Sequence, residues 1–361
     1  KGSAAILMNT SLWEADLSSS NLSSANLKDA DLRLADLRLA DITRANLMNA
    51  QLGNADLSGA NLSSANLANA RFSNTRINGI IINDETILNN SIRQSHEIVN
   101  SGRKSVFFRE ALYYIALDGL DLSGVKFHTP SGVNRLGNLR NKDLSGTNLK
   151  NTSLAFLDLS RVTIDDNTYL DPKWRSVWEA SNISLIGEDW AGKDLSESVI
   201  SYGVLSNIDL TKSDFHLAQI TRTNLQGAKL VDSALSQSRI SSSSLFGAKL
   251  SNCDFRGATM SDSDFSEADL SGAKFGYVGN RNPDPLGFTI STSTSVNLCS
   301  FEDANLANIT VESRGTRYVS FYFCDFTNAN LEGSELTHPN TFQECIFKNT
   351  KMPDGTIRTD P

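Results

Sequence analysis

Apolar side chains recur at every fifth position over long stretches of this chain. Residues 45–70 read ANLMNAQLGNADLSGANLSSANLANA, with a leucine at the centre of each five-residue unit and an alanine two positions before it. An amphipathic helix repeats about every 3.6 residues and a half-buried strand about every 2, so neither element keeps these leucines on one face. A fixed short period predicts a solenoid, in which the chain turns a corner once per unit.

Two long runs carry this period. The first extends from Leu7 to Ile92 in steps of five, and the second from Leu195 to Phe275. Shorter runs occupy Leu139 to Ile164 and Phe301 to Leu336, the last with Thr316 as a polar centre. Ser, Gly and Asn fill the positions between units, and these residue types tolerate turn geometry. Each unit is expected to form one side of a coil, and the coils stack at about 4.7–4.9 Å, as β-strands do.

The repeated A(D/N)LXX units resemble those of the pentapeptide-repeat proteins. This resemblance implies an all-β solenoid, a right-handed quadrilateral β-helix, here with short α-helical insertions. In that fold the central Leu or Phe and the small residue two positions before it point inward, and the other three positions face outward. The small residue fits this geometry because closely packed interiors penalise inserted bulk by about 1–3 kcal/mol.

Segments that depart from the period divide the chain. The expected order is a repeat β-helix at 1–92, a helical insertion at 93–117, a short repeat block at 118–170 with a loop at 128–138, a second helical insertion at 171–192, a second repeat β-helix at 193–275, a loop insertion at 276–298, and C-terminal coils with a cap at 299–361. The block at 118–170 is too short to bury its own ends, so we expect one continuous column. Two columns side by side are the alternative.

Two of these departures are copies of one module. Residues 82–100 and 164–182 align without gaps and share an Asp, a Thr, a Leu, an Arg, a Glu and an Asn at equivalent positions. In the second copy, Asp171 and Pro172 predict a helix start, with the carboxylate capping free N–H groups and proline at the first helical position. A similar helix is expected at 105–117. Modules that end in KWRSVWE, and the closing KMPDG, resemble those of pentapeptide-repeat proteins abundant in cyanobacteria.

Aromatic side chains in the insertions are the candidate partner-binding residues. Trp174, Val177 and Trp178 fall at helical spacing and form one apolar face. That face either packs against the solenoid wall, which is the favoured interpretation, or forms a hot spot for a partner. The remaining candidates, in the first insertion, are Phe107, Phe108, Tyr113 and Tyr114.

No catalytic, cofactor or metal site is predicted. The histidines are spread over different segments, and none is spaced from a carboxylate or cysteine in a recognisable pattern: His96, His128, His216 and His338. Most aspartates stand immediately before a central residue, so they are interpreted as repeat surface. The four cysteines each stand two positions before an aromatic residue: Cys253, Cys299, Cys324 and Cys345. They are expected to fill the small inward position, with a redox or metal role as the alternative.

These features predict a non-enzymatic structural or protein–protein interaction scaffold. A rigid β-helix would display its insertions to a protein partner or a larger assembly, at little cost in ordering entropy. An exposed terminal coil could also join copies of the chain into a homo-oligomer. The alternative is a DNA-mimicking inhibitor or protector of a DNA-binding enzyme such as gyrase, as the quinolone-resistance type of this family implies.

Charge argues against mimicry and against nucleic-acid binding. Residues 1–92 carry nine acidic and seven basic side chains, which is a weak field for a DNA mimic. No basic stripe with interleaved aromatic residues is present. No apolar run of about 18 residues and no signal peptide near Lys1 is found, which predicts a soluble chain and favours the cytoplasm. The thylakoid lumen or periplasm is the alternative, if an upstream signal has been removed.

Overall fold

The computed structural model describes residues 4–101, 106–108, 115–128, 137–278, 294–312, 319–336 and 341–359. Only the backbone is described for residues 106–108, 126–128 and 137–138. The same holds for residues 94, 98, 100 and 101, which lie in a helix. These residues form two compact units. The first comprises the described residues up to 128 together with 137–153 and 162–171, and the second comprises 154–161 and 172–359.

The regular elements are short, because each side of a coil is only one repeat unit long. The first unit contains α1 (Asn90–Ser101), β1 (Val106–Phe108), β2 (Lys126–His128) and β3 (Gly137–Asn138). The second unit contains β4 (Leu157–Asp158), α3 (Pro172–Asn182), β5 (Val199–Ser201), β6 (Gln219–Thr221), β7 (Arg239–Ser241), β8 (Thr259–Ser261), β9 (Lys274–Gly276), β10 (Ser295–Asn297), β11 (Thr310–Glu312), β12 (Ser320–Tyr322), β13 (Phe342–Gln343), β14 (Thr350–Lys351) and β15 (Ile357–Arg358).

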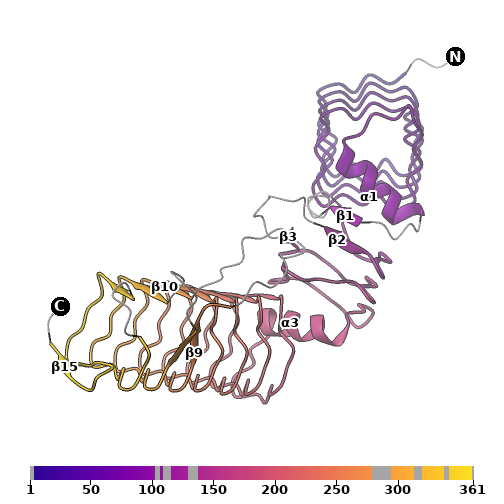
Figure 1. The fold of residues 1–361 in the computed structure, drawn as a ribbon. Helices are drawn as coiled ribbons and strands as arrows, with labels where there is room; N and C mark the ends of the chain where they lie inside the picture. Colours follow the sequence, from indigo (N-terminus) through magenta and orange to yellow (C-terminus); the bar gives the residue numbers. More distant parts are fainter. Residues whose placement is uncertain are drawn as a thin grey trace. The chain divides into compact units, whose positions relative to one another are not determined.

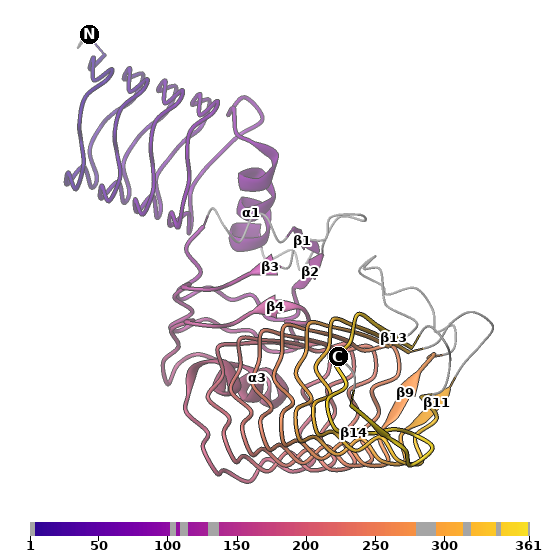
Figure 2. The same cartoon turned by 90° about the vertical axis from the view of Figure 1, so that its left-hand side faces the viewer.

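The first unit winds into four-sided coils, which Figure 1 shows nearly end-on and Figure 2 shows from the side. Parallel bridges join equivalent residues of successive coils, as between Asn26 and Asn46. The N–H of Leu27 donates to the carbonyl of Asn46 at 2.8 Å, and the N–H of Asn46 donates to the carbonyl of Ala25 at 2.9 Å. The coils are therefore stacked parallel β-structure, and the predicted solenoid is confirmed.

The second unit continues the same construction with more regular strands. One wall is a parallel sheet in which the strands follow the order β13-β12-β10-β8-β7-β6-β5-β4. Its register places Ile220 opposite Ile200 and Ile240. A second parallel pair joins β9 to β11, and β14 and β15 form an antiparallel hairpin near the C-terminus. Figure 1 shows α3 at the start of this stack of coils.

Central residues of the repeat fill the axis of both units. Every central residue from Leu195 to Phe275 is buried, and so is every one from Leu22 to Ile77. In the second unit the rings of Phe265, Phe301, Phe326 and Phe347 form a column, with successive centroids 5.2, 5.1 and 5.5 Å apart. Burying each such side chain contributes about 1.5–3 kcal/mol, so this axial column is the main source of stability.

The period of five breaks at Ile87, contrary to the prediction that this residue is central. Ile87 is 52 % exposed and pairs with Asn66 in the ladder. Thr86 fills the small inward position instead, and its hydroxyl donates to the carbonyl of Leu62 at 3.1 Å. One residue is therefore inserted in the first run. Counting in fives missed the insertion because an isoleucine happens to stand at position 87.

The two aligned modules both enter a helix, as predicted. Helices α1 and α3 begin at equivalent positions of the alignment. Asn89 caps α1, since its Oδ1 accepts the N–H of Ile92 at 2.8 Å. Pro172 is the first residue of α3, whereas the carboxylate of Asp171 accepts the N–H of Asn151 at 2.9 Å. The Asp171 carboxylate, which was expected to cap the helix, thus bonds the backbone of the preceding coil.

Helix α1 packs at the end of the coils that precede it (Figures 1 and 2). Ile92 and Ser95 are buried, and Nε2 of His96 lies 3.0 Å from the carbonyl oxygen of Ile80. The guanidinium of Arg93 donates to the carbonyl of Thr86. The helix therefore covers apolar surface that the next coil leaves open.

The helix predicted at 105–117 is wrong where the structure describes that segment. Val106–Phe108 form β1, which pairs in parallel with β2. Ile115 is buried and bridges to Thr75. The backbone of this segment is bonded to neighbouring coils, and these ladder bonds outweigh the helical spacing of its aromatic residues. Tyr113 and Tyr114 lie outside the described residues.

The repeat also resumes earlier than expected after two insertions. Beyond α3, Ser184 already bridges to Val204 and Asp189 to Asp209, within the segment assigned to the second helical insertion. In the segment expected to be a loop at 276–298, residues 295–297 form β10 between β8 and β12. Much of that loop lies outside the described residues.

Candidate protein-interaction surface

Where Asp or Asn stands immediately before a central residue, its side chain can stabilise the turn that follows. Oδ1 of Asp16 accepts the N–H of Ser18 at 3.0 Å, and Oδ1 of Asn46 accepts the N–H of Met48 at 3.2 Å. Such side-chain bonds to the backbone two residues on are typical of Asx turns. They also hold the pKa of Asp16 below its ordinary value, chiefly through the Ser18 hydroxyl and then its N–H. These carboxylates are structural, and the sequence interpretation of them as plain surface missed this role.

The small inward position supplies a second repeated bond. In the second unit the hydroxyl of Ser233 donates to the carbonyl of Leu210 at 2.8 Å, and the thiol of Cys253 donates to the carbonyl of Leu230 at 2.9 Å. The Cys253 thiol thus makes the bond that the Ser233 hydroxyl makes in the neighbouring coil. Cys253, like its equivalent Ser233, packs as a small inward residue.

The corner of each unit, two residues after the central one, has a left-handed backbone. In most coils Asn, Gly, Ser or a charged residue stands there, as at Asn49 (φ 62°) and Ser64 (φ 62°). Bulky apolar residues rarely adopt this conformation, which costs of the order of 1–3 kcal/mol outside glycine. In the part of the chain that the structure describes, four exposed corners nevertheless carry one: Leu34, Leu39, Leu298 and Phe323. We call these four residues the apolar corners.

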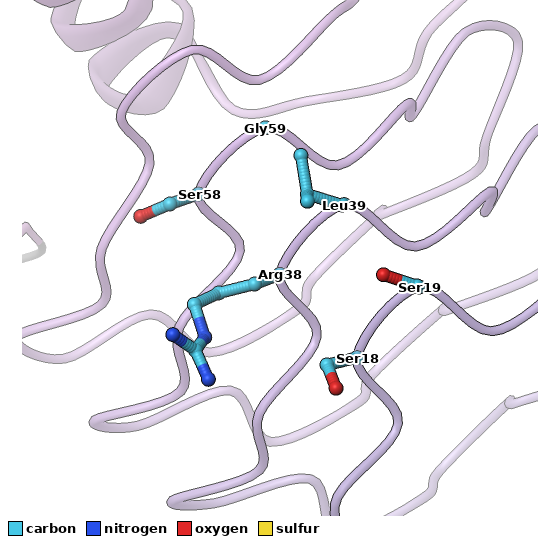
Figure 3. A pocket seen from close by; sticks show the side chains of 6 residues that line it. All are labelled: Ser18, Ser19, Arg38, Leu39, Ser58 and Gly59. Atoms are coloured by element: carbon cyan, nitrogen blue, oxygen red, sulfur yellow. The ribbon is translucent and has the colours of Figure 1, made fainter.

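Leu39 stands beside a shallow hollow of the first unit (Figure 3). The hollow has a volume of about 500 Å³ and is lined mainly by small residues: Ser18, Ser19, Arg38, Leu39, Ser58 and Gly59. Leu39 is 69 % exposed. A Cβ atom at Gly59, which has φ of +71°, would lie 2.6 Å from Cδ2 of Leu39. Glycine at this corner therefore provides the space that the leucine side chain occupies.

The charges beside Leu39 are paired with one another. Nε of Arg38 donates to Oδ1 of Asp36 at 2.8 Å, and the Arg38 N–H donates to the same oxygen at 3.0 Å. The pKa of Asp36 is lowered, mainly by the Arg38 side chain. The Leu39 side chain is therefore an exposed apolar group at a hollow lined mainly by small residues. The ion pair beside it is compensated.

In the second unit two apolar corners lie on adjacent coils. The N–H of Leu298 donates to the carbonyl of Tyr322, and the N–H of Phe323 donates to the carbonyl of Gln343, which places these corners one above the other. Both side chains are more than half exposed, Phe323 at 59 %. The equivalent corner of the preceding coil is Asp262 and that of the following coil is Glu344, so acidic residues flank the pair.

The candidates predicted from sequence lie elsewhere. Trp174 is 7 % exposed, and Trp178 is half-buried. Lys173 lies over the Trp174 ring and Arg175 over the Trp178 ring, at 5.2 and 5.9 Å from the centroids. The side chains of Phe107 and Phe108 are not described. A role of these residues in partner binding stays a prediction.

Helix α3 packs closely on the first coils of the second unit. Nζ of Lys173 donates to Oγ of Ser196 at 2.7 Å and lies 3.0 Å from Oδ1 of Asp194. Position 203 requires glycine, because a Cβ atom there would lie 2.6 Å from the carbonyl oxygen of Ala180. This close backbone approach fixes the helix on the wall and accounts for glycine at the small inward position two residues before Leu205.

Sequence reasoning missed the apolar corners, although a signal was present. In ADLRLADLRLADI the second residue after a central one is leucine twice, where Asn, Ser and Gly are usual.

Within the described residues, no three His, Cys, Asp or Glu side chains are grouped to hold a metal ion. The helices that the structure describes are all too short or too polar to cross a membrane.

Comparison with known families agrees with this geometry. A family model described as pentapeptide repeats matches residues 5–44, 45–84, 204–237, 218–256 and 238–276. These are the segments in which the coils are most regular and the central residues are buried. Residues 5–84 and 204–276 are therefore pentapeptide repeats.

Several solved structures are similar to this chain. HetL, a pentapeptide-repeat protein involved in heterocyst differentiation regulation in the cyanobacterium Nostoc sp. strain PCC 7120, is 17 % identical, with 98 % of this chain and 92 % of HetL covered and a TM-score of 0.22. Rfr23 from the cyanobacterium Cyanothece 51142 is 35 % identical over 24 % of this chain and 62 % of its own, with a TM-score of 0.16. QnrB1, a plasmid-mediated fluoroquinolone resistance protein, is 15 % identical over 64 % and 88 %, with a TM-score of 0.18. No curated protein matches this chain.

Proposed function

We propose that this protein is a non-enzymatic scaffold that binds a protein partner through its apolar corners. The observation that carries the proposal is the position of Leu39 and Phe323. Each is mostly exposed, and each stands at a left-handed corner where a bulky residue is unfavourable. Neither fills the axial column, so the fold gains little from them.

A rigid wall makes such side chains effective contacts. The corners are held by backbone bonds to the adjacent coils, as between the N–H of Leu39 and the carbonyl of Ser58 at 2.9 Å. Little conformational entropy is therefore lost when a partner binds. Apolar side chains on a preorganised surface are typical centres of protein interfaces. The partner is expected to present an apolar pocket or groove of complementary shape.

Affinity purification of the full chain from its native host tests this proposal. The variants are Leu34→Asn with Leu39→Asn, and Leu298→Asn with Phe323→Asn, because asparagine occupies many other corners. Asn69→Ser, at an equivalent corner, is the matched control. We expect at least one double variant to lose a co-purifying protein that the wild type and the control retain, with a Tm no lower than that of the wild type. Retention of every partner by both double variants would refute the proposal.

The alternative of DNA mimicry receives no support from the first unit. Asp31 and Asp36 are each bonded to an arginine two residues on, with Nε to Oδ1 distances of 2.8 Å. These pairs weaken the acidic field that a mimic would need. A gyrase supercoiling assay with the purified protein decides the matter, and potent inhibition would replace the scaffold proposal with this alternative.

A further inference from the structure

Two cysteines occupy the same inward position on successive coils of the second unit. The N–H of Ile346 donates to the carbonyl of Cys324 at 2.9 Å, and Asp325 bridges to Ile346, so Cys345 follows Cys324 in the stack. Stacked strands are about 4.7–4.9 Å apart. A disulfide spans Cα separations of about 4.4–6.8 Å, so these two residues lie within bonding reach.

The two thiols differ in access. Cys324 is 1 % exposed, whereas Cys345 is partly exposed. Cys345 borders a hollow of about 420 Å³ near the C-terminal hairpin, lined also by Phe342, Glu344, Ile346, Phe347 and Arg358. The Arg358 guanidinium carbon lies 4.3 Å from the Phe347 ring centroid, which places a cation at the same hollow. A small polar reagent in this hollow reaches the sulfur of Cys345 and not that of Cys324.

The two thiols also differ in ionisation. The contact between the two thiols is the main cause that lowers the pKa of Cys345 to about 7, with a smaller contribution from the charge of Arg358. The same contact and burial raise the pKa of Cys324. The exposed member of the pair is therefore the better thiolate, and the thiolate is the reactive form of cysteine.

The other two cysteines lack these properties. Burial raises the pKa of Cys253 to about 12 and that of Cys299 to about 11. Cys253 has Ser233 and Ala273 at the equivalent position of the adjacent coils, as the bonds from the N–H of Asp254 to the carbonyl of Ser233 and from the N–H of Lys274 to the carbonyl of Cys253 show. Cys299 stacks on the far side of Cys324 and is buried. The paired, accessible arrangement is thus confined to the coil next to the C-terminal hairpin.

We propose that Cys345 is an oxidation site for hydrogen peroxide and that Cys324 converts the product to a disulfide within the chain. The Cys345 thiolate attacks one peroxide oxygen, the O–O bond breaks, and the departing hydroxide takes a proton to leave as water. Cys345 then carries a sulfenic acid. The sulfur of Cys324 attacks that of Cys345, an S–S bond forms, and the sulfenic hydroxyl leaves with the Cys324 proton as a second water.

This disulfide would be readily reduced. Cys345 borders the hollow near the C-terminal hairpin, so a thiol reductant has access to the bond. Exposed disulfides have more oxidising potentials and act as reversible bonds. The oxidised form therefore ties the last coils to one another until a thiol reductant opens the bond.

Peroxide treatment of the full chain, followed by intact mass measurement and peptide mapping, tests the proposal. We expect the wild type to lose the mass of two hydrogen atoms, to yield one peptide pair joined through Cys324 and Cys345, and to recover four free thiols with dithiothreitol. The Cys345→Ser variant should lose no thiols. The Cys324→Ser variant should trap a sulfenic acid on Cys345 that reacts with dimedone.

Serine already occupies this inward position in other coils, as at Ser263, so these variants keep the repeat intact. The matched control is Cys253→Ser, which should form the disulfide as the wild type does. Four free thiols in the peroxide-treated wild type would overturn the proposal. A bridge from Cys299 to Cys324, or one between two chains, would overturn it equally.

Discussion

Thr86 and Thr168 make the same hydrogen bonds in the two copies of the duplicated module. The Thr86 hydroxyl donates to the carbonyl of Leu62 at 3.1 Å, and the Thr168 hydroxyl donates to the carbonyl of Leu144 at 2.9 Å. Each hydroxyl oxygen also accepts the N–H of the residue three positions earlier. One side chain thus satisfies two backbone groups at the point where the coil gives way to a helix.

Thr86→Val and Thr168→Val are each expected to destabilise the protein. Valine keeps the shape but removes the acceptor of the Asn83 or Asp165 N–H, and leaving such a group unsatisfied costs about 1–3 kcal/mol. The carbonyls of Leu62 and Leu144 lose one of two bonds, since the N–H groups of Ala65 and Thr147 still donate to them. The free energy of unfolding from urea titrations measures the effect. Thr310→Val, on an exposed strand position, is the control and should change little. An equal free energy of unfolding for all three variants would contradict the role assigned to the Thr86 and Thr168 hydrogen bonds.

Leu57 and Leu39 differ sharply in what they contribute to stability. Leu57 is fully buried on the axis, so Leu57→Ala should cost about 2–5 kcal/mol, and Leu57→Lys more because it buries an unpaired charge. Leu39→Ala removes a mostly exposed side chain and should change the free energy of unfolding by less than about 0.5 kcal/mol. Chemical denaturation of the variants checks both expectations. An unaltered Leu57→Lys midpoint would disprove the inward assignment.

Lys142 should make the free energy of unfolding depend on pH in the alkaline range. It is buried, its Nζ donates to the carbonyl of Ile115 at 2.9 Å and to Oδ1 of Asn74 at 3.3 Å, and desolvation lowers its pKa to about 8 from 10.5. Between these values the unfolded chain binds more protons than the folded one, so stability rises as pH increases through this window. Below about pH 8 both states are protonated and this contribution to the slope disappears.

The Lys142→Met variant isolates this contribution. The free energy of unfolding of the wild type, minus that of the variant, should increase between about pH 8 and about pH 10, since one pKa unit corresponds to about 1.4 kcal/mol. Other titrating groups cancel in the difference. A difference that stays constant with pH would show that Lys142 has an ordinary pKa in the folded state.

Gly203→Ala should loosen α3 from the wall of the second unit. The added methyl group would approach the carbonyl oxygen of Ala180 to 2.6 Å, so the helix or the coil must move. We expect a lower Tm and a change in the near-ultraviolet circular dichroism of the buried Trp174. Gly53→Ala is the matched control, because a Cβ atom there would meet only ordinary contacts at 3.7 Å or more. A larger loss in the control than in Gly203→Ala would argue against this packing.

The period of five predicted the axis of the solenoid but not every change of register. It placed Leu205 and Leu230 inward correctly because one position in five must always fill the column. It failed at Ile87, since hydrophobicity does not distinguish an inward isoleucine from one that extends the ladder outward. The hydrogen bonds of Thr86 decide that register, and a count of apolar residues does not include them.

The candidate surface was harder to anticipate for a different reason. Leu34 and Leu39 look like ordinary apolar residues until the backbone at their positions is known to be left-handed. The strand at 106–108 was missed because its pairing partners lie in other coils. Local pattern therefore predicts what faces the axis, whereas contacts between coils decide where the repeat begins, stops and resumes.

In the described coils, the backbone of each inner coil is bonded to the coils directly before and after it. Under a pulling force along the axis of one unit, these interfaces bear the load in series, and the interface with the fewest bonds separates first. Under a force across the axis, the rungs of one wall share the load together. Each unit should accordingly be mechanically anisotropic, peeling coil by coil from an end along one direction and resisting shear along the other.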